Sequence, residues 1–415
     1  MSQHRFEAYL DKVFDFSRLV AALPEGRQYP QHPWPKVFST LFLGAAMQWP
    51  SLLQMQEECR SGVLAQRIGS ISDDTLGYAM QRQQPEPIFK LGCEVARRLK
   101  RNGILRSDWS RGLVVAAVDG IEICKSFARC CDACLKREVN HKVHGVARTD
   151  VQCHHRIVVV TVVSAPFPIP LGVRFQKEGE GEVACAQALL EDLVQHLGRR
   201  FVDVLIGDAL YLQAPFVEAV ERLGLDWEFN LKDNQPDLLR EAERLTAGVP
   251  DGTKPGSDEE LCWWHAPEVF WPVANRSVRV VKTERVQQKR EVTIDAHRKK
   301  GKTEVTLEST NFYATNFQLG SISPLFIHQV GRSRWGIDTQ VFQTLTTDCH
   351  LKHPAVHQDT AIIILTMIRL LAYTLSLLFY RRQICSRVRH GMPETFLEFA
   401  KRLAYWFVAL STDTG

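Results

Sequence analysis

The sequence predicts an α/β protein, and three observations support that class. The segment "GLVVAAVDGIEI" (residues 112–123) is a continuous apolar run rich in β-branched residues, typical of a strand buried on both faces. Strand-like and helical segments then alternate as far as about residue 245, as expected of an α/β layer. With 415 residues, 45% of them hydrophobic and 24% charged, the chain can bury a sizeable core.

Residues 1–108 are predicted to form a helical N-terminal region. The stretch "KVFSTLFLGAAMQWPSLLQMQEEC" carries apolar residues at helical spacing, and "SISDDTLGYAMQR" offers a cap before another helix. Residues 109–245 are predicted to form the first part of the α/β core. Its strands are expected in "HRIVVVTVVSAPFPIPLGVRF", "VDVLIGD" and "DWEFNLK", and its helices in "EVACAQALLEDLVQHLGRRF", "APFVEAVERLG" and "PDLLREAERL".

The alternation stops near residue 246, and residues 246–317 read as a β-rich insertion. This segment holds a basic cluster, because ten Lys and Arg residues between Arg276 and Lys302 accompany only three acids. Lys299, Lys300 and Lys302 are the densest part of that cluster. Two interpretations stay open, a solvated β-ribbon and a contact surface for DNA.

Residues 318–415 are predicted to hold the closing helices. The segment "AIIILTMIRLLAYTLSLLFY" (residues 361–380) is long enough to span a bilayer. Arg369 lies at its centre, and no second segment of this kind is present in the sequence. A charge at that position is costly in lipid, which favours a buried helix over a membrane span.

The overall charge and the cysteine content limit the class of protein further. The formal net charge of +4 is only mildly basic, so affinity for nucleic acid must come from local clusters. The eleven cysteines are scattered, and the N-terminal "MSQHRFEAYLDKVFDF" has charges where a signal peptide would be apolar. We therefore expect a cytoplasmic protein.

Three aspartates stand where acids are unusual. Asp119 ends "LVVAAVD" and Asp208 ends "VLIGD", so both are expected at the carboxyl ends of buried strands, where α/β sheets place their ligands. Asp338 shares the apolar arc of a predicted helix with Trp335, so it is expected to point toward the core and to need a partner. A simple structural ion pair with Arg334, one turn earlier, is one interpretation.

Divalent metal ions give a second interpretation of the same acids. Three carboxylates held together repel one another unless cations compensate them. Mg²⁺ takes carboxylate oxygens, waters and phosphates as ligands, and two ions about 4 Å apart can stabilise the entering and leaving oxygens of a phosphoryl transfer.

The segments around these acids resemble the signature regions of DDE-type insertion-sequence transposases, which have an RNase H-like catalytic core. The resemblance covers roughly residues 70 to 370 and is most specific in "IGDALYLQAPFVEAVERLGLDWEFNLKDNQPDLL" and "GRSRWGIDTQVFQTLTTDCHLKH". It implies that Asp119, Asp208 and Asp338 are the catalytic residues and ligands of two Mg²⁺ or Mn²⁺ ions. It also implies that residues 246–317 are an insertion ahead of the final catalytic helix.

The resemblance further implies contacts to DNA by Lys232 and Arg334, alongside Lys299, Lys300 and Lys302. The chain departs from the family in three places. The family usually has Glu where Asp338 stands, often has a Tyr near Gly331, and often has a Lys near Leu345.

A separate group of potential ligands lies in "CCDACLKREVNHKVH". Cys131, Cys134, His141 and His144 have the chemistry of a tetrahedral Zn²⁺ site, but their spacing is not that of a familiar zinc finger. A reduced, metal-free loop is the favoured interpretation. His350, His353 and His357 receive no role.

The sequence thus predicts a transposase that cleaves DNA strands and transfers them during transposition of an insertion sequence. Double-stranded DNA, with terminal inverted repeats, is the expected partner of a homodimer, and no membrane is expected. The alternative is a decayed or repurposed copy that binds DNA through the helical N-terminal region (residues 1–108) and the basic cluster without cutting it.

Overall fold

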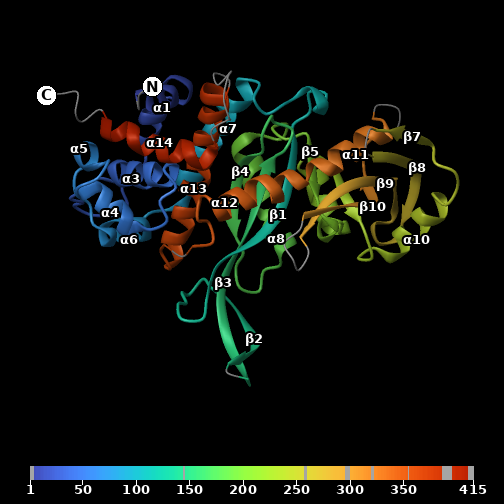
Figure 1. The fold of residues 1–415 in the computed structure, drawn as a ribbon, viewed down its shortest axis with the longest axis horizontal. Helices are drawn as coiled ribbons and strands as arrows, with labels where there is room; N and C mark the ends of the chain where they lie inside the picture. The colour runs from blue at the N-terminus through green and yellow to red at the C-terminus, as the bar shows by residue number, and fades with distance from the viewer. Residues whose placement is uncertain are drawn as a thin grey trace. The chain divides into compact units, whose positions relative to one another are not determined.

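The computed structural model describes residues 4–143, 145–256, 259–294, 300–318, 322–353, 355–385 and 395–409. The chain divides into two compact units. Unit 1 comprises Met1–Leu105, Gly120–Gly198 and Gly336–Gly415, and unit 2 comprises Arg106–Asp119 and Arg199–Trp335. The predicted α/β class is confirmed, since the structure combines a large mixed sheet with many helices (Figure 1).

Unit 1 contains the N-terminal and C-terminal helices. Its helices are α1 (His4–Phe14), α2 (Phe16–Ala21), α3 (Trp34–Ala46), α4 (Leu52–Arg60), α5 (Ala65–Ile68), α6 (Asp73–Gln81), α7 (Pro85–Arg101), α8 (Glu182–Leu197), the π-helix η4 (Ile337–Phe342), α12 (Gln343–Thr347), α13 (Asp359–Phe379), the π-helix η5 (Tyr380–Cys385) and α14 (Phe396–Ala409). Its strands are the second part of β1 (Val115–Ser126), β2 (Leu135–Val143), β3 (Val146–Val162) and β4 (Ile169–Phe175). The strand order is β2-β3-β1, and β4 also pairs with β3.

Helix α13 is the core of unit 1. It packs against α3, α6, α7 and β4. Of its most apolar stretch of 18 residues, 89% is buried. It is the one described helix long and apolar enough to cross a membrane. Its buried Arg369 donates hydrogen bonds to the backbone carbonyls of His350 (2.8 Å), His353 (3.4 Å) and Pro50 (3.3 Å). These dipoles stabilise the buried charge, as expected for a core helix.

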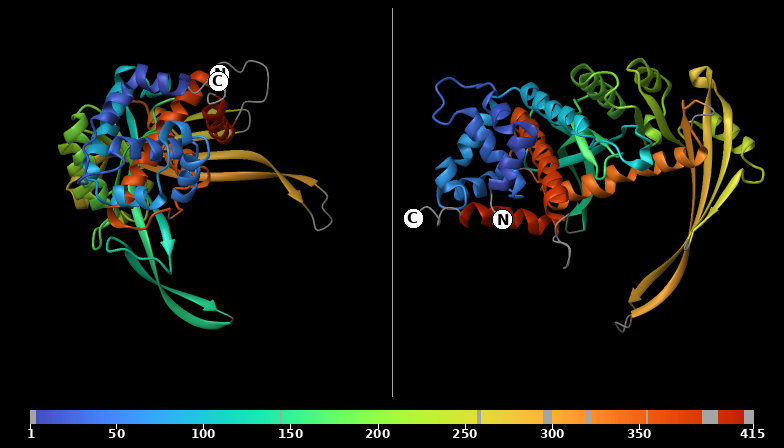
Figure 2. Two further views of the ribbon diagram at one scale, coloured as in Figure 1. Left: turned by 90° about the vertical axis from the view of Figure 1, so that its left-hand side faces the viewer. Right: turned by 90° about the horizontal axis from the view of Figure 1, so that it is seen from above.

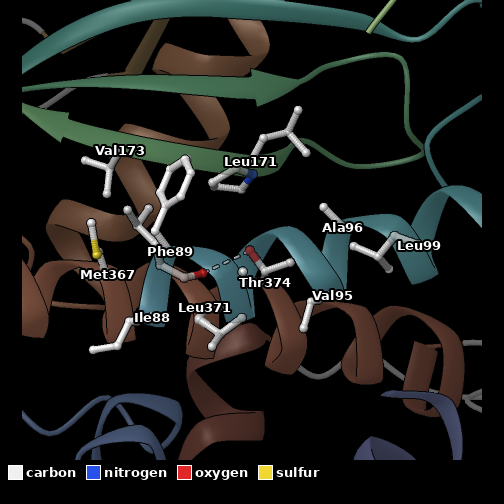
Figure 3. A pocket seen from close by; sticks show the side chains of 14 residues that line it. Ile88, Phe89, Val95, Ala96, Leu99, Leu171, Val173, Met367, Leu371 and Thr374 are labelled. Carbon is white, nitrogen blue, oxygen red and sulfur yellow. Dashed lines mark hydrogen bonds between the residues drawn. The ribbon is translucent and has the colours of Figure 1, made fainter. Parts of the chain in front are cut away.

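The packing between α7, β4 and α13 leaves a small apolar pocket (Figure 3). The pocket holds about 50 Å³ and is lined mainly by aliphatic side chains such as Val95, Leu171 and Leu371. Thr374, which also lines it, donates its hydroxyl to the carbonyl of Leu370 at 2.9 Å. Because apolar cavities stay dry, this pocket is a packing gap in the core of unit 1.

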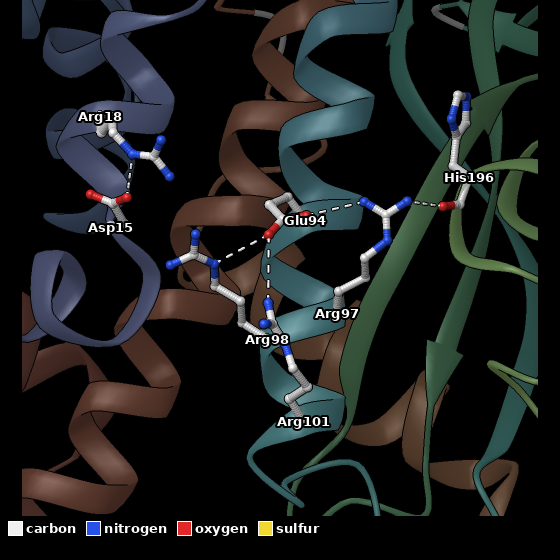
Figure 4. Close-up of polar contacts among 7 residues, drawn as sticks. All are labelled: Asp15, Arg18, Glu94, Arg97, Arg98, Arg101 and His196. Carbon is white, nitrogen blue, oxygen red and sulfur yellow. Dashed lines mark hydrogen bonds and ion pairs between the residues drawn. The ribbon is translucent and has the colours of Figure 1, made fainter.

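Helix α7 is amphipathic, and its polar face is rich in arginine (Figure 4). Glu94 pairs with Arg97 (3.0 Å), Arg98 (3.3 Å) and Arg101 (3.8 Å). Arg97 also donates to the carbonyl of His196, which ties α7 to the end of α8. Three guanidinium groups around one carboxylate leave this face with excess positive charge.

Unit 2 contains the remaining strands. They are the first part of β1, β5 (Val204–Gly207), β6 (Asp226–Leu231), β7 (Gly252–Pro255), β8 (Glu259–Trp271), β9 (Arg276–Ile294) and β10 (Lys300–Thr315), in the order β1-β5-β6-β10-β9-β8-β7. Strands β1, β5 and β6 are parallel, and β10, β9, β8 and β7 continue the sheet in antiparallel pairs. Figure 2 shows the length and curvature of β9 and β10.

The helices of unit 2 position the strand ends. They are the 3₁₀ turns η1 (Asp108–Ser110), η2 (Ala209–Tyr211) and η3 (Pro272–Ala274), and the α-helices α9 (Ala214–Arg222), α10 (Pro236–Leu245) and α11 (Pro324–Ser333). Helix α9 packs on β6 and α10 on β8, whereas α11 contacts β5, β6, β8, β9 and β10. Residues 114–118 are fully buried, which explains why their sequence is apolar without alternation.

Two local predictions were wrong. Strand β1 does not end at Asp119 but continues to Ser126, because its second part lies beside β3 in unit 1. Trp335 was expected in the buried arc, yet 57% of it is exposed. The helix is interrupted at Arg334 and continues as a π-helix from Ile337, so a regular spacing of about 3.6 residues per turn does not apply there.

Candidate active site

The parallel strands of unit 2 bring three of the predicted site residues to one edge of the sheet. Asp119 lies two residues beyond the last pair of β1 with β5, which joins Ala117 and Ile206. Asp208 directly follows β5, and Lys232 directly follows β6. Asp119 follows the end of the parallel pairing, although β1 itself continues, so Asp119, Asp208 and Lys232 share the position at which α/β sheets bind ligands.

The register also places both aspartates on one face of the sheet. Ala117, Ile206 and Glu228 are partners in adjacent strands and therefore point to the same side. Asp119 lies two residues after Ala117, and Asp208 lies two residues after Ile206. Asp208 keeps an extended backbone (φ −78°, ψ −176°). Side chains alternate along an extended chain, so both carboxylates point to the face that carries Glu228.

The turn after Asp208 is held by the carboxylate itself and by side chains of the "KDNQP" segment (residues 232–236). Asp208 Oδ1 accepts a hydrogen bond from the backbone N–H of Leu210 at 2.8 Å. Asn234 donates to the carbonyl of Ala209 at 2.6 Å, and Gln235 donates to that of Leu212 at 2.8 Å. The two amide side chains therefore fix the loop after β5 against the loop after β6.

Arg334, at the end of α11, contacts the first aspartate. Its Nη1 lies 3.4 Å from Asp119 Oδ2, and the two side chains are 10% and 16% exposed. The guanidinium also lies over the ring of Trp335, 4.7 Å from its centroid. The sequence suggested Arg334 as a partner of Asp338 or of DNA, and the pairing with Asp119 was not predicted.

A fourth acid on this face was not predicted from the sequence. Glu228, in the middle of β6, is 1% exposed. Burial raises its pKa well above the ordinary value, although the backbone of Gly331 and the charge of Arg279 act in the opposite direction. The sequence "DWEFNL" alternates polar and apolar residues, so it did not distinguish the buried Glu228 from the less buried Asp226 and Asn230.

The structure leaves no room for a side chain at Gly331, where the family often has a nearby Tyr. A Cβ atom there would lie 2.3 Å from Cε1 of Tyr313 and 2.5 Å from Oε1 of Glu228. Helix α11 therefore approaches β6 and β10 closely at this point, with the ring of Tyr313 filling the adjacent space.

Asp338 belongs to unit 1 and is the second residue of the π-helix η4. It is partly buried, while its neighbours Ile337, Val341 and Phe342 are buried. Such short π-helical segments are frequent at functional sites. Because Ile337, Val341 and Phe342 are buried, they form the apolar arc that was expected around Asp338.

The structure describes the predicted DNA-contacting lysines to different extents. Lys232 is exposed. Lys299 lies outside the described residues, and Lys300 and Lys302 are described only as backbone in β10, paired with Ile294 and Val292.

Four other basic residues of β9, all with described side chains, make contacts within unit 2. Arg276 pairs with Glu221 and Lys282 with Glu284, each at 2.7 Å. Arg285 pairs with Glu259, and the buried Arg279 contacts His265 at 2.8 Å. Arg279 and Arg285 therefore link β9 to β8, and Arg276 links β9 to α9, whereas the Lys282–Glu284 pair lies within β9.

The cysteine and histidine prediction is changed by the structure. His144 lies outside the described residues, and the side chain of His141 is not described. Cys131 and Cys134 instead meet His155 and His357, and the ligand atoms of these four residues lie within 4.8 Å of one another. Local spacing could not identify the two histidines, because they are 24 and 223 residues from their cysteine partners.

A comparison with known families identifies the chain. The sequence model of the family described as "Transposase DDE domain" matches residues 149–375, which is more than half of the chain. The protein therefore belongs to the DDE transposase domain family. The matched range includes Asp208 and Asp338 and begins after Asp119.

Comparison with solved structures gives a distant match. A piggyBac transposase, solved by cryo-EM in a synaptic complex with hairpin DNA, is 10% identical with a TM-score of 0.43. The match covers 97% of this chain and 79% of that chain. No curated protein sequence matches the chain.

Proposed function

We propose that the protein is a DNA transposase of an insertion sequence, with Asp119, Asp208 and Asp338 as its catalytic acids. The observation that carries the proposal is the placement of Asp119, just beyond the parallel pairing of β1 with β5, and of Asp208, at the carboxyl end of β5, on one face of the sheet. The third acid is assigned by the match of "RSRWGIDTQVFQTL" to the family motif.

The donor set fits Mg²⁺ or Mn²⁺, because carboxylate oxygens are the ligands that these hard cations prefer. When bound, two such ions lower the pKa of a water or a DNA 3′-hydroxyl and stabilise charge on the phosphodiester. Asp119, Asp208 and Asp338 would hold them. The hydrogen bond from Leu210 keeps the Asp208 carboxylate oriented before any ion arrives.

The basic residues at the site have separate roles in this proposal. Arg334 supports Asp119 by balancing its charge, since the two side chains lie 3.4 Å apart. Lys232 is exposed beside the strand ends and would bind a DNA phosphate as a point charge. Lys299, Lys300 and Lys302 would add sequence-independent affinity for the DNA backbone.

The proposed partner is double-stranded DNA that carries terminal inverted repeats, bound by a homodimer in the cytoplasm. Strand cleavage and strand transfer need no covalent bond to the protein, because positioning and charge stabilisation supply the catalysis. The excess positive charge around Arg97, Arg98 and Arg101 on α7 is a second surface suited to DNA.

A plasmid assay tests the proposal. Purified full-length protein, incubated with supercoiled plasmid and Mn²⁺, should convert the plasmid to nicked or linear forms. Asp119→Asn and Asp208→Asn should abolish this conversion while DNA binding persists in a mobility-shift assay. Asp237→Asn is the matched control, because this acid is exposed and lies on α10. DNA binding without cleavage by the parent protein would favour the repurposed DNA-binding protein instead.

A further inference from the structure

Four side chains of unit 1 converge although they come from three separate parts of the chain. Cys131 and Cys134 lie in the turn between β1 and β2, His155 lies in β3, and His357 precedes α13. His155 and Cys134 are buried, and Cys131 and His357 are partly buried. The cluster shares no residue with the three proposed catalytic acids.

The sulfur–sulfur and three of the sulfur–nitrogen distances within the cluster are close to those of a tetrahedral metal site. The two sulfur atoms lie 3.5 Å apart, and each lies 3.4 Å from Nε2 of His155. Nε2 of His357 lies 3.1 Å from the sulfur of Cys134. A tetrahedron with Zn–S bonds of about 2.3 Å and Zn–N bonds of about 2.0 Å has edges of roughly 3.3 to 3.8 Å. These four separations are shorter than the corresponding edges by a few tenths of an ångström, and all four ligand atoms lie within 4.8 Å of one another.

We infer that Cys131, Cys134, His155 and His357 form a structural Zn²⁺ site. Two thiolates and two neutral imidazoles complete a tetrahedral shell without an open position for substrate, which is the mark of a structural rather than a catalytic zinc. The charges of two thiolates and one Zn²⁺ cancel, so the site can be buried at low cost. Sulfur ligands also discriminate against Mg²⁺ and Mn²⁺, which prefer oxygen.

The surroundings already hold the ligands in place. The backbone N–H of Cys131 donates to the sulfur of Cys134 at 3.4 Å, and the N–H of Cys134 donates to the carbonyl of Cys131 at 3.1 Å. The N–H of Ala133 donates to the carboxylate of Asp359, the first residue of α13, at 3.3 Å. The turn is therefore attached to α13 independently of a metal.

Zinc at this position would cross-link segments that are distant in sequence. Cys134 and His357 are 223 residues apart, so the site joins the turn after β1 to the start of the core helix α13. Because the unfolded chain has no such preformed site, metal binding would favour the folded state of unit 1.

Metal analysis of the full-length protein tests the site. Protein expressed with added zinc should contain an equimolar amount of zinc in addition to any Mg²⁺ or Mn²⁺. Replacement of zinc by Co²⁺ should give the visible absorption bands of tetrahedral Co²⁺ and a thiolate-to-metal charge-transfer band. Chelation should lower the melting temperature, and added Zn²⁺ should restore it.

Matched variants distinguish zinc held by these four ligands from zinc bound elsewhere on the protein. Cys134→Ser and His357→Asn should lose the zinc and the Co²⁺ bands, whereas the neighbouring Cys130→Ser and His353→Asn should keep both. Zinc content that is absent from the parent protein, or equally reduced in the Cys130 variant, would overturn the inference. A Cys131–Cys134 disulfide without metal, detected by mass spectrometry of the freshly purified parent, would overturn it as well. The parent protein gives an answer by itself if the ligand variants do not fold.

Discussion

Arg334 and Asp119 form an ion pair within unit 2, with Nη1 and Oδ2 3.4 Å apart, although 215 residues separate them in the chain. Both side chains are largely buried. A cation therefore already faces the first proposed metal ligand. This ion pair ties the end of α11 to β1. The contribution of Arg334 to stability should therefore depend on whether another cation binds the Asp119 carboxylate.

Replacing Arg334 by Gln should destabilise the metal-free protein by about 1 to 3 kcal/mol, because a mostly buried carboxylate loses this charged partner. Saturating Mn²⁺ should reduce that loss, since the bound metal supplies the missing positive charge. Urea denaturation of the parent and the variant, with and without Mn²⁺, measures both effects. Arg240→Gln, from an exposed pair with Asp237, is the control and should change stability little. An Arg334 penalty of the same size in Mn²⁺ would separate this pair from metal binding.

Glu228→Gln should stabilise the protein increasingly as the pH rises. Burial raises the pKa of Glu228 above its ordinary value of 4.5, so the folded state keeps a proton that the unfolded chain releases. The parent therefore loses stability from about pH 4.5 upward, at up to about 1.4 kcal/mol per pH unit, until the folded-state pKa is passed. Gln does not titrate and avoids this loss.

Denaturation at pH 5 and at pH 8 checks this prediction, with Glu218→Gln at an exposed position of α9 as the control. A Glu228→Gln variant that is more destabilised at pH 8 than at pH 5 would show that Glu228 is ionised and held by Arg279.

Gly331→Ala should destabilise unit 2 by about 1 to 3 kcal/mol, because the new Cβ would overlap Tyr313 and Glu228. Gly92→Ala is a close control, since Gly92 also lies within a helix but a Cβ there meets nothing within 4 Å. That control should be neutral or stabilising by up to about 1 kcal/mol, as Ala favours helix. Equal effects of the two substitutions on thermal unfolding would contradict the close approach of α11 to the sheet.

Replacing Lys299, Lys300 and Lys302 together by Ala should weaken DNA binding and flatten its salt dependence. Removing one lysine–phosphate interaction should reduce the slope of log affinity against log salt by roughly one unit. Fluorescence anisotropy with a short duplex across several salt concentrations gives this slope. Lys401→Ala, at an exposed position of α14, serves as the comparison. An unchanged slope in the triple variant would assign the β9–β10 segment a purely structural role.

Asp338→Glu should retain or increase plasmid cleavage, whereas Asp338→Asn should abolish it. The longer Glu side chain is usual at this position in the family, and it supplies the same carboxylate oxygens. Stabilisation by Mn²⁺ grows with occupancy of the site, so the increase in melting temperature that Mn²⁺ produces should shrink in the Asn variant. A folded but inactive Glu variant together with an unchanged response of the Asn variant to Mn²⁺ would place the third ligand elsewhere.

Local sequence patterns predicted the features that depend on local chemistry. The apolar runs of β1 and β5 predicted buried strands, because strands covered on both faces need apolar side chains throughout. Asp208 was placed correctly at the end of β5 for the same reason. Arg369 in the apolar helix correctly indicated a buried core helix, and its carbonyl partners show how that charge is accommodated.

Features set by distant contacts could not be predicted in this way. The partner of Arg334 lies in another strand, and no local spacing relates His155 to His357. Trp335 was misplaced because the prediction assumed one regular helix, whereas the chain changes to a π-helix at Ile337. Each of these depends on which segments meet in the folded chain.

The division of the chain into units has a consequence for folding during translation. Unit 1 is assembled from three segments, the last beginning at Gly336, whereas unit 2 ends at Trp335. A ribosome that has released the chain only to Trp335 has supplied all of unit 2 but not α13, against which α3, α6 and α7 pack. Until α13 is synthesised, the early helices therefore expose an apolar face, which makes the incomplete chain prone to aggregation. Asp338 emerges in the same final segment, so an incomplete chain holds only two of the three proposed catalytic acids.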